Sequence, residues 1–198
     1  VDVTIDERSL HEVYLPHFKA AVDAGVASIM SAYNSMNGAW CGQNATLLTT
    51  ILKEQWGFDG FVLTDFIFGM RDAKQAALAG QDLEMPFQNL FERGLKELVE
   101  QGDVPLARID DAALRLLRQQ IRFGQGRRPG DYTAEVLNCA EHRQLAREAA
   151  QKGIVLLKNE GDLLPLRNMR RVAVIGKLAE TPNTGDRGSS NTNPAYVV

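Results

Sequence analysis

The stretch that decides the fold is Trp56-Gly57-Phe58-Asp59-Gly60-Phe61-Val62-Leu63-Thr64-Asp65-Phe66. Its Trp-Gly pair ends a helix, its Asp-Gly pair turns the chain, and residues 61–63 form a short apolar run typical of a buried parallel strand. Asp65 therefore arrives at the carboxyl end of a strand, which is where α/β barrels place catalytic groups. The alternative is that Asp65 caps a following helix, since aspartate is common at helix N-termini.

The first two thirds of the chain alternate between strand and helix patterns. A helix that opens with a capping box at Thr4 and Glu7 is expected up to Gly25. The same reasoning gives strands at residues 26–32 and 61–63, a strand end at 82–85, and helices at 45–56, 72–79, 90–100 and 109–123. A repeat of roughly 30 residues fits right-handed parallel βα units.

A second domain is predicted after the Gly/Pro/Arg-rich segment 124–130, the only break long enough for an interdomain linker. Beyond it we expect a helix from His142 to Gly153 and two strands, at residues 154–157 and 171–175, that begin another parallel sheet. The tail at 186–198 is rich in Gly, Ser and Asn. The chain therefore has the organisation expected of a fragment truncated at both ends.

Composition narrows the classes of partner. The 198 residues are 44% hydrophobic, and 22 basic and 25 acidic residues are interspersed to a formal charge of −3. No basic patch favours nucleic acid, and no apolar run approaches the ~20 residues of a membrane span. Cys41 and Cys139 lie far apart without zinc-ligand spacing, so two free thiols are expected.

Several blocks of sequence, in the same order, resemble glycoside hydrolase family 3, the family of β-glucosidases and β-xylosidases. In the first part they are residues 24–34, 37–38, 47–48, 51–52, 54–60, 64–65, 79–82 and 85–86. In the second part they are residues 146–150, 153–159, 164–166, 172–176 and 188–190. The resemblance implies an α/β fold: residues 1–124 would form the C-terminal half of a (β/α)8 TIM-like barrel, 125–142 an interdomain linker, and 143–198 the start of an α/β sandwich domain.

The same resemblance implies a retaining β-glycosidase, with a β-glucosidase as the first choice and Asp65 as the nucleophile. Retaining enzymes also need a carboxylic acid ~5–5.5 Å away from the nucleophile. Asp82 and Glu84 would be the obvious choices from the barrel pattern alone, but in the family the acid/base Glu comes from the second domain, later than anything present here. We therefore interpret Asp82 as structural, accepting backbone N–H bonds, and expect the isolated fragment to be inactive.

Three side chains near Asp65, and one in the second part, are implied to contact the sugar. Tyr33 would donate a hydrogen bond to the nucleophilic carboxylate, and Met30 would offer a soft apolar wall, unless it is ordinary core. Phe66 stands where the family commonly has Trp, so it keeps an aromatic face but lacks the indole N–H. Ser190, or its neighbour Ser189, would reach the sugar from a Gly/Ser loop that could equally be a connector.

No metal or organic cofactor is implied, and the expected partner is a β-glucoside or oligosaccharide. A homo-oligomer of the parent enzyme and its compartment, whether periplasmic, secreted or cytoplasmic in a bacterium, stay open. The rival interpretations are a β-xylosidase, a β-N-acetylhexosaminidase, or a carbohydrate-binding relative without catalysis.

Overall fold

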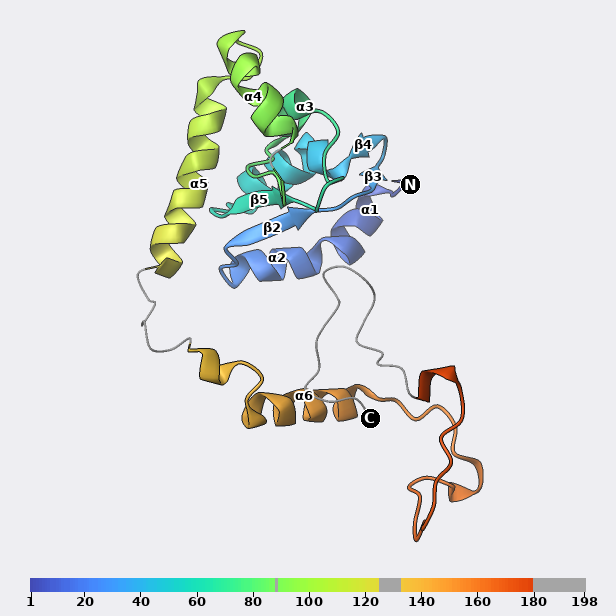
Figure 1. Cartoon of the computed structure of the whole chain (residues 1–198). Coiled ribbons are helices and arrows are strands. Elements are labelled where there is room, and N and C mark those ends of the chain that lie inside the picture. Colours follow the sequence, from blue (N-terminus) through green and yellow to red (C-terminus); the bar gives the residue numbers. More distant parts are fainter. Residues whose placement is uncertain (88, 125–132, 180–198) are drawn as a thin grey trace. The chain divides into compact units, whose positions relative to one another are not determined.

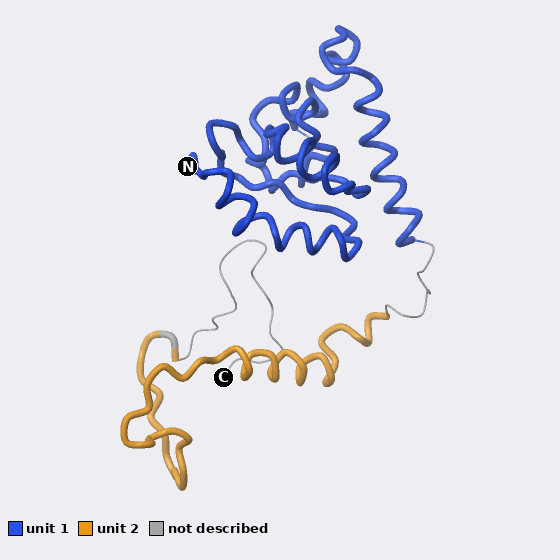
Figure 2. Tube along the Cα trace, turned by 180° about the vertical axis from the view of Figure 1, so that it is seen from behind, with its two compact units in different colours: residues 1–127 blue, residues 128–198 orange. Residues whose placement is uncertain are grey.

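The computed structural model describes residues 1–87, 89–124 and 133–179 (Figure 1). The chain divides into two compact units, Val1–Arg127 and Arg128–Val198 (Figure 2). The first unit mixes helices with parallel strands, in agreement with an α/β fold. Of the linker expected at 125–142, residues 125–132 lie outside the described residues, and so do Ser189 and Ser190. The described remainder, 133–142, contains the short helix η4 (Ala134–Val136) and the beginning of α6 (Ala140–Gly153).

A parallel pair of strands carries the carboxylate identified from the sequence. Strand β2 (Ser28–Ser31) pairs with β5 (Phe61–Thr64), and Met30 lies opposite Leu63. A third parallel segment joins at the single bridge between Leu63 and Leu83. Helix η3 (Thr46–Gln55) connects β2 to β5, and α3 (Ala73–Ala79) connects β5 to the Leu83 segment, so two successive βα units are present.

The helix expected from Thr4 to Gly25 is wrong in two respects. It begins at Glu7, and its N-terminus is capped by Asp6, whose Oδ1 accepts from the backbone N–H of Ser9 at 2.9 Å. It is also interrupted before Pro16, which has no N–H to continue the hydrogen-bond ladder. The segments are α1 (Glu7–Ser9), η1 (Leu10–Tyr14) and α2 (Pro16–Asp23).

Residues 34–42, between the strand predicted at 26–32 and the helix predicted at 45–56, contain a small hairpin. Strands β3 (Ser35–Met36) and β4 (Ala39–Trp40) are antiparallel, and β1 (Asp2–Val3) pairs with β3 in parallel. Asn37 and Gly38 turn the chain with positive φ values of 51° and 86°. An Asn-Gly pair favours this backbone in a two-residue hairpin turn. The short helix η2 (Cys41–Gln43) follows.

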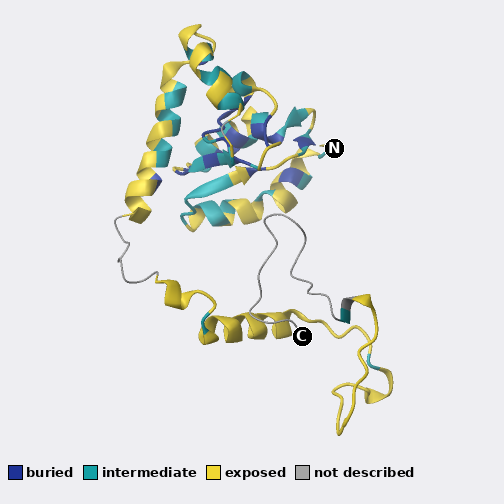
Figure 3. Cartoon of the chain, viewed as in Figure 1, coloured by how far each residue is buried: buried dark blue, intermediate teal, exposed yellow. Residues whose placement is uncertain are grey.

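The core of the first unit lies between the sheet and η3, where the buried residues gather (Figure 3). Val62 is fully buried against Leu48, Leu52 and Phe58, and Ile29 packs against the same cluster. Because side chains alternate across a strand, Met30, Leu63 and Asp65 belong to the opposite face of the sheet. The helix-covered face therefore stabilises the fold and leaves the other face to the candidate site.

Two long helices complete the first unit: α4 (Leu90–Glu100), confirmed at the predicted bounds, and α5 (Leu106–Gly124), which begins three residues before the predicted start. In the second unit, α6 (Ala140–Gly153) is present and is joined by the short helices η4 (Ala134–Val136), η5 (Glu160–Asp162) and η6 (Lys177–Ala179).

The strands expected at residues 154–157 and 171–175 are wrong: neither segment is a strand in the structure. Leu157 and Ile175 are 92% and 91% exposed. β-propensity reflects packing on a sheet, and a parallel strand forms only when a neighbour satisfies its backbone N–H and C=O groups. Within the described residues neither segment has such a neighbour, so the apolar pattern alone does not produce a second sheet.

Candidate active site

Asp65 extends the β2–β5 ladder by one residue. Its backbone N–H donates to the carbonyl of Ser31 at 3.2 Å, one step beyond the last residue of β5. Its Oδ1 accepts from the backbone N–H of Phe66 at 2.7 Å, and the residue is half-buried. The carboxylate thus stands at the carboxyl end of the parallel strand, as the sequence predicted.

The alternative role for Asp65, as a helix cap, is wrong. The helix that follows is α3, and its N-cap is Asp72, whose Oδ1 accepts from the backbone N–H of Gln75 at 2.7 Å. Asp65 lies seven positions earlier, before the loop that separates β5 from α3. Its side chain is therefore not required to satisfy a helix N-terminus.

Tyr33 and Asp65 are brought together by β2 and β5. Tyr33 follows β2 by two residues, and its side chain is 44% exposed. Its pKa is raised, first by desolvation, then by a hydrogen bond with the Asp65 side chain and by the negative charge of that carboxylate. The phenol therefore keeps its proton and offers it to the carboxylate, which suits a site where a carboxylate must be oriented.

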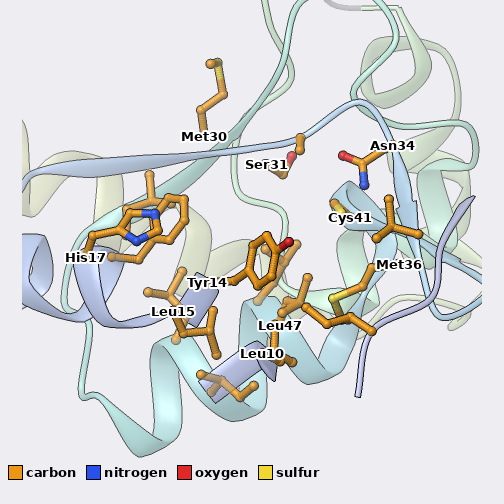
Figure 4. A pocket seen from close by; sticks show the side chains of 18 of the residues that line it. Leu10, Tyr14, Leu15, His17, Met30, Ser31, Asn34, Met36, Cys41 and Leu47 are labelled. Carbon is orange, nitrogen blue, oxygen red and sulfur yellow. The ribbon is translucent and has the colours of Figure 1, made fainter. Parts of the chain in front are cut away.

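Met30 and Phe66 lie on either side of this pair in sequence. Met30 is 52% exposed, so the alternative that it is ordinary core does not hold for the described residues. Its side chain points away from the apolar side chains that pack between the sheet and the first helices (Figure 4). Phe66 is exposed as well, at 41%. An accessible face of Met30, Tyr33 and Phe66 thus belongs to the same end of the sheet as Asp65.

Asp82 and Glu84, the two other carboxylates near a strand end, bind backbone N–H groups or buried cations of the fold. Asp82 is fully buried, its Oδ2 accepts from the backbone N–H of Val62 at 2.8 Å, and its Oδ1 pairs with Lys53 at 2.8 Å and with Arg108. The prediction that Asp82 accepts a backbone N–H is confirmed. Burial lowers the pKa of Lys53 to about 8, although the charge of Asp82 and its hydrogen bond act in the opposite direction.

Glu84 holds the beginning of α4. Its two carboxylate oxygens accept from the backbone N–H groups of Asn89, Leu90 and Phe91 at 2.9, 3.0 and 2.9 Å. Sequence reasoning missed this role, because Asn89 is the residue type expected at a cap, yet its side chain makes no capping bond. The sequence does place Glu84 a few residues before the helix predicted at 90–100, a position from which its carboxylate can bind the helix N-terminus.

An apolar cavity of about 360 Å³ lies between the first helices and strand β2 (Figure 4). Leu10, Tyr14, Ile29, Leu48 and Trp56 are among its lining residues, and Asp65 is not. This cavity belongs to the contact between the helices and the strands, and it holds no carboxylate. Met30 of β2 also lines this cavity, whereas Asp65, Tyr33 and Phe66 do not.

Among the described residues, no cluster of His, Cys, Asp and Glu could hold a metal ion, and Cys41 and Cys139 are free thiols. None of the helices that the structure describes is long and apolar enough to cross a membrane.

The arrangement defines an α/β protein with a carboxylate and a phenol at the carboxyl edge of its parallel strands. Comparison with known proteins is consistent with it. The family model described as "Glycosyl hydrolase family 3 N terminal domain" matches residues 1–119, and the model of that family's C-terminal domain matches residues 154–198. The chain belongs to glycosyl hydrolase family 3.

Similar curated proteins are β-glucosidases. The chain is 39% identical to a beta-glucosidase of Rhizobium radiobacter over 98% of its length and 24% of that protein. It is 37% identical to thermostable beta-glucosidase B of Acetivibrio thermocellus over its whole length and 26% of that protein. The chain thus spans about a quarter of the length of these relatives.

Solved structures give the same picture. Beta-glucosidase 3B from Thermotoga neapolitana, in complex with alpha-D-glucose, matches 99% of the chain and 28% of its own length, with a TM-score of 0.81 and 31% identity. An exo-1,3/1,4-beta-glucanase from a Pseudoalteromonas species matches 84% of the chain and 23% of its own length, with a TM-score of 0.77 and 36% identity.

Proposed function

We propose that this chain is part of a retaining β-glucosidase that removes terminal β-D-glucosyl residues through a covalent glycosyl–aspartate intermediate. The observation that carries the proposal is the carboxylate of Asp65 at the end of β5, faced by the phenol of Tyr33. The β-glucosidase relatives and the glucose complex of a solved relative support glucose over xylose as the sugar.

In the first step, an Asp65 carboxylate oxygen attacks the anomeric carbon, a C–O bond to the aspartate forms, and the bond to the leaving oxygen breaks. A carboxylic acid donates its proton to that leaving oxygen. In the second step water attacks the same carbon, gives a proton back to the acid/base group, and releases Asp65 as a carboxylate. Tyr33 stabilises the ionised nucleophile, and Met30 and Phe66 contact the sugar.

The acid/base group is proposed to lie outside this chain. Asp82 is fully buried in ion pairs and Glu84 binds three backbone N–H groups, so neither side chain has the freedom to deliver a proton to substrate. Because the chain spans about a quarter of its relatives' length, we infer that the activity belongs to a longer parent protein.

The fold proposed for that parent assigns residues 1–124 to the C-terminal half of a (β/α)8 barrel, 125–142 to a linker and 143–198 to the start of an α/β sandwich. The parallel βα succession of β2, η3, β5 and α3 supports the first assignment. Ser190, or Ser189, is proposed to reach the sugar from the second domain.

The test is Asp65→Ala in the parent protein, with Asp110→Ala as the control, since Asp110 is an exposed carboxylate on α5. Asp65→Ala is expected to abolish turnover of an aryl β-glucoside, and external formate to restore part of it. Asp110→Ala is expected to keep the rate of the unmodified protein. Near-normal activity in Asp65→Ala would rule the assignment out.

A further inference from the structure

The loop that follows Asp65 is folded tightly against it. The backbone N–H of Phe66 donates to Asp65 Oδ1, and the N–H of Phe68 donates to the carbonyl of Phe66 at 2.7 Å. Between them, Ile67 has a φ of +67°, a value that β-branched residues rarely adopt. Such a conformation persists only where the surroundings enforce it, so other contacts must hold this loop.

Two glycines let the backbone of the loop pack directly behind Asp65. A Cβ atom at Gly69 would stand 2.5 Å from the carbonyl oxygen of Asp65 and 2.6 Å from its nitrogen, closer than real Cβ contacts. A Cβ atom at Gly42 would collide in turn with the carbonyl oxygen of Gly69. The main chain of Asp65 is thus backed by Gly69, and Gly69 by Gly42, without intervening side chains.

Arg71 closes the loop from the other end. Its Nη1 donates to the carbonyl of Phe68 and, at 3.3 Å, to that of Met70. The guanidinium carbon lies 4.7 Å from the ring centroid of Trp40 and 5.4 Å from that of Phe68. Planar guanidinium groups stack favourably on aromatic rings in this range. The side chain therefore joins the loop to β4.

The main chain of Arg71 is fixed as well. Gln43 Oε1 accepts from the backbone N–H of Arg71 at 2.6 Å and from that of Asp72 at 3.0 Å. Arg71 is thus anchored to η2 by its backbone, to β4 by its stack on Trp40, and to the loop by Nη1. These three attachments fix the end of the loop that lies farthest from Asp65 in sequence.

We infer that Arg71 is a positioning residue for the Asp65 carboxylate, a role that rests on the proposed function. A continuous series of hydrogen bonds links them: Arg71 Nη1 to Phe68 O, Phe68 N to Phe66 O, and Phe66 N to Asp65 Oδ1. Arg71 holds the strained turn at Ile67 in place, and the turn fixes the Phe66 N–H that orients the carboxylate. Small misplacements of a reacting group cost up to about 100-fold in rate.

The experiment measures inactivation of the parent protein by 2-deoxy-2-fluoro-β-D-glucosyl fluoride. Asp65 attacks the anomeric carbon of this reagent, a C–O bond forms, and the C–F bond breaks with release of fluoride. Because fluoride is a good leaving group, the acid/base residue contributes little, and the rate constant of inactivation reports the nucleophile itself. The apparent dissociation constant of the reagent is obtained from the same data.

Arg71→Met keeps an unbranched side chain near the rings of Trp40 and Phe68 but removes the positive charge and the hydrogen-bond donors. It is expected to lower the rate constant of inactivation about tenfold or more, and to change the dissociation constant by less than about threefold. Arg71→Lys, which retains one donor group, is expected to recover part of the rate. Arg118→Met is the matched control, because Arg118 is exposed and its Nη1 also donates to a backbone carbonyl, that of Asp59; it should inactivate at the normal rate.

An unchanged rate constant in Arg71→Met would overturn the inference, and so would a loss confined to the dissociation constant. If Arg71→Met does not fold, Arg71→Lys decides: the inference requires a rate below that of the unmodified protein, and an equal rate overturns it. If the unmodified protein is not labelled on Asp65, the proposed function itself fails. If the unmodified protein is labelled on Asp65 but the Arg71 variants are inactivated at the same rate, only the inference about Arg71 is overturned.

Discussion

In the proposed function the Asp65 carboxylate attacks a sugar carbon, so it must stay ionised and correctly aimed. Tyr33 follows the neighbouring strand, and the pKa of its phenol is raised by desolvation first, and then by a hydrogen bond with the Asp65 carboxylate and by the charge of that group. Because the hydrogen bond is to a charged acceptor, its loss is worth more than that of a neutral bond, about 1.5–3 kcal/mol.

Tyr33→Phe in the parent protein is therefore expected to slow turnover by roughly tenfold to a hundredfold. Steady-state kinetics with an aryl β-glucoside measures the effect, and Tyr14→Phe, which changes an exposed tyrosine of η1, provides the control. Unchanged kinetics in Tyr33→Phe would place the phenol outside the site.

At the residue scale, the sequence predicted the position of Asp65 but could not choose between a site residue and a helix cap. The choice depends on where α3 begins, and Asp72 takes the cap because the loop extends for several residues after Asp65. The positioning role inferred for Arg71 could not be predicted from the sequence, because its contact with Trp40 joins residues 31 positions apart. Contacts of this kind are set by tertiary packing and not by local pattern.

At the scale of elements, β5 is held in register by charged groups on its helix-covered side. Asp82 binds the backbone N–H of Val62 and two cations, and Glu84 anchors α4 beside it. A buried carboxylate is tolerated only when its partners offset the cost of desolvation. Asp82 therefore contributes to where the strand end lies, and hence to where Asp65 lies, whereas Glu84 stabilises the beginning of α4.

Glu84→Gln is expected to lower the free energy of unfolding of the parent by about 1.5–3 kcal/mol, because the amide loses the charge and one of two acceptor oxygens. Its turnover should stay close to that of the unmodified protein. Urea unfolding and kinetics measure the two quantities, and Glu92→Gln, on the exposed side of the same helix, is the control. A rate loss of roughly 10²–10⁴ without loss of stability would instead mark Glu84 as the general acid.

Lys53 gives the stability a pH dependence. Its pKa is about 8 in the folded protein against an ordinary value of 10.5, so between these values the unfolded chain binds more protons and the free energy of unfolding rises with pH. Below about pH 8 both states are protonated and the folded state bears the whole cost of burial. The rise across this range is on the order of 3 kcal/mol.

Lys53→Met is expected to remove this rise. Urea unfolding of the parent at several pH values between the two pKa values measures it as a growing difference between the unmodified protein and the variant. Lys74→Met, which removes a half-exposed lysine paired with Asp103, should follow the unmodified protein. A difference that stays constant over this range would contradict the assignment of the shift to Lys53.

Among the elements, periodicity predicted α4 and most of α3, α5 and η3, because each has an apolar stripe that its own unit buries. The strands at residues 154–157 and 171–175 failed for the complementary reason. Their apolar runs have the composition of buried strands, but a strand needs a neighbour, and sequence pattern does not say whether one is available. The Asn37-Gly38 hairpin was predictable from turn chemistry and was missed.

At the scale of the whole molecule, the proposed function requires catalytic groups from this chain and from the rest of a longer parent protein. Within the described residues β2 pairs along one edge only, with β5. An unpaired strand edge invites association with other chains. The second unit exposes apolar side chains as well, Leu157 and Ile175 among them.

The 198-residue chain alone is therefore expected not to hydrolyse 2,4-dinitrophenyl β-glucoside, even though this substrate needs little acid assistance. Release of the phenol is followed by absorbance, with the parent protein as the positive control. If the chain alone released it, and Asp65→Ala removed that activity, the division of the site would be wrong and Asp82 or Glu84 would have to be reconsidered as the acid.

The most direct test of Asp65 as the nucleophile is the configuration of the product that its variant makes with azide. The parent carrying Asp65→Ala is given 2,4-dinitrophenyl β-glucoside and sodium azide, and the anomer of the glucosyl azide is determined by NMR. Azide that takes the place of the missing carboxylate attacks opposite the leaving group, so α-D-glucosyl azide is expected. Formation of β-D-glucosyl azide, which would mark Asp65 as the acid/base, or undiminished hydrolysis without azide, would contradict it.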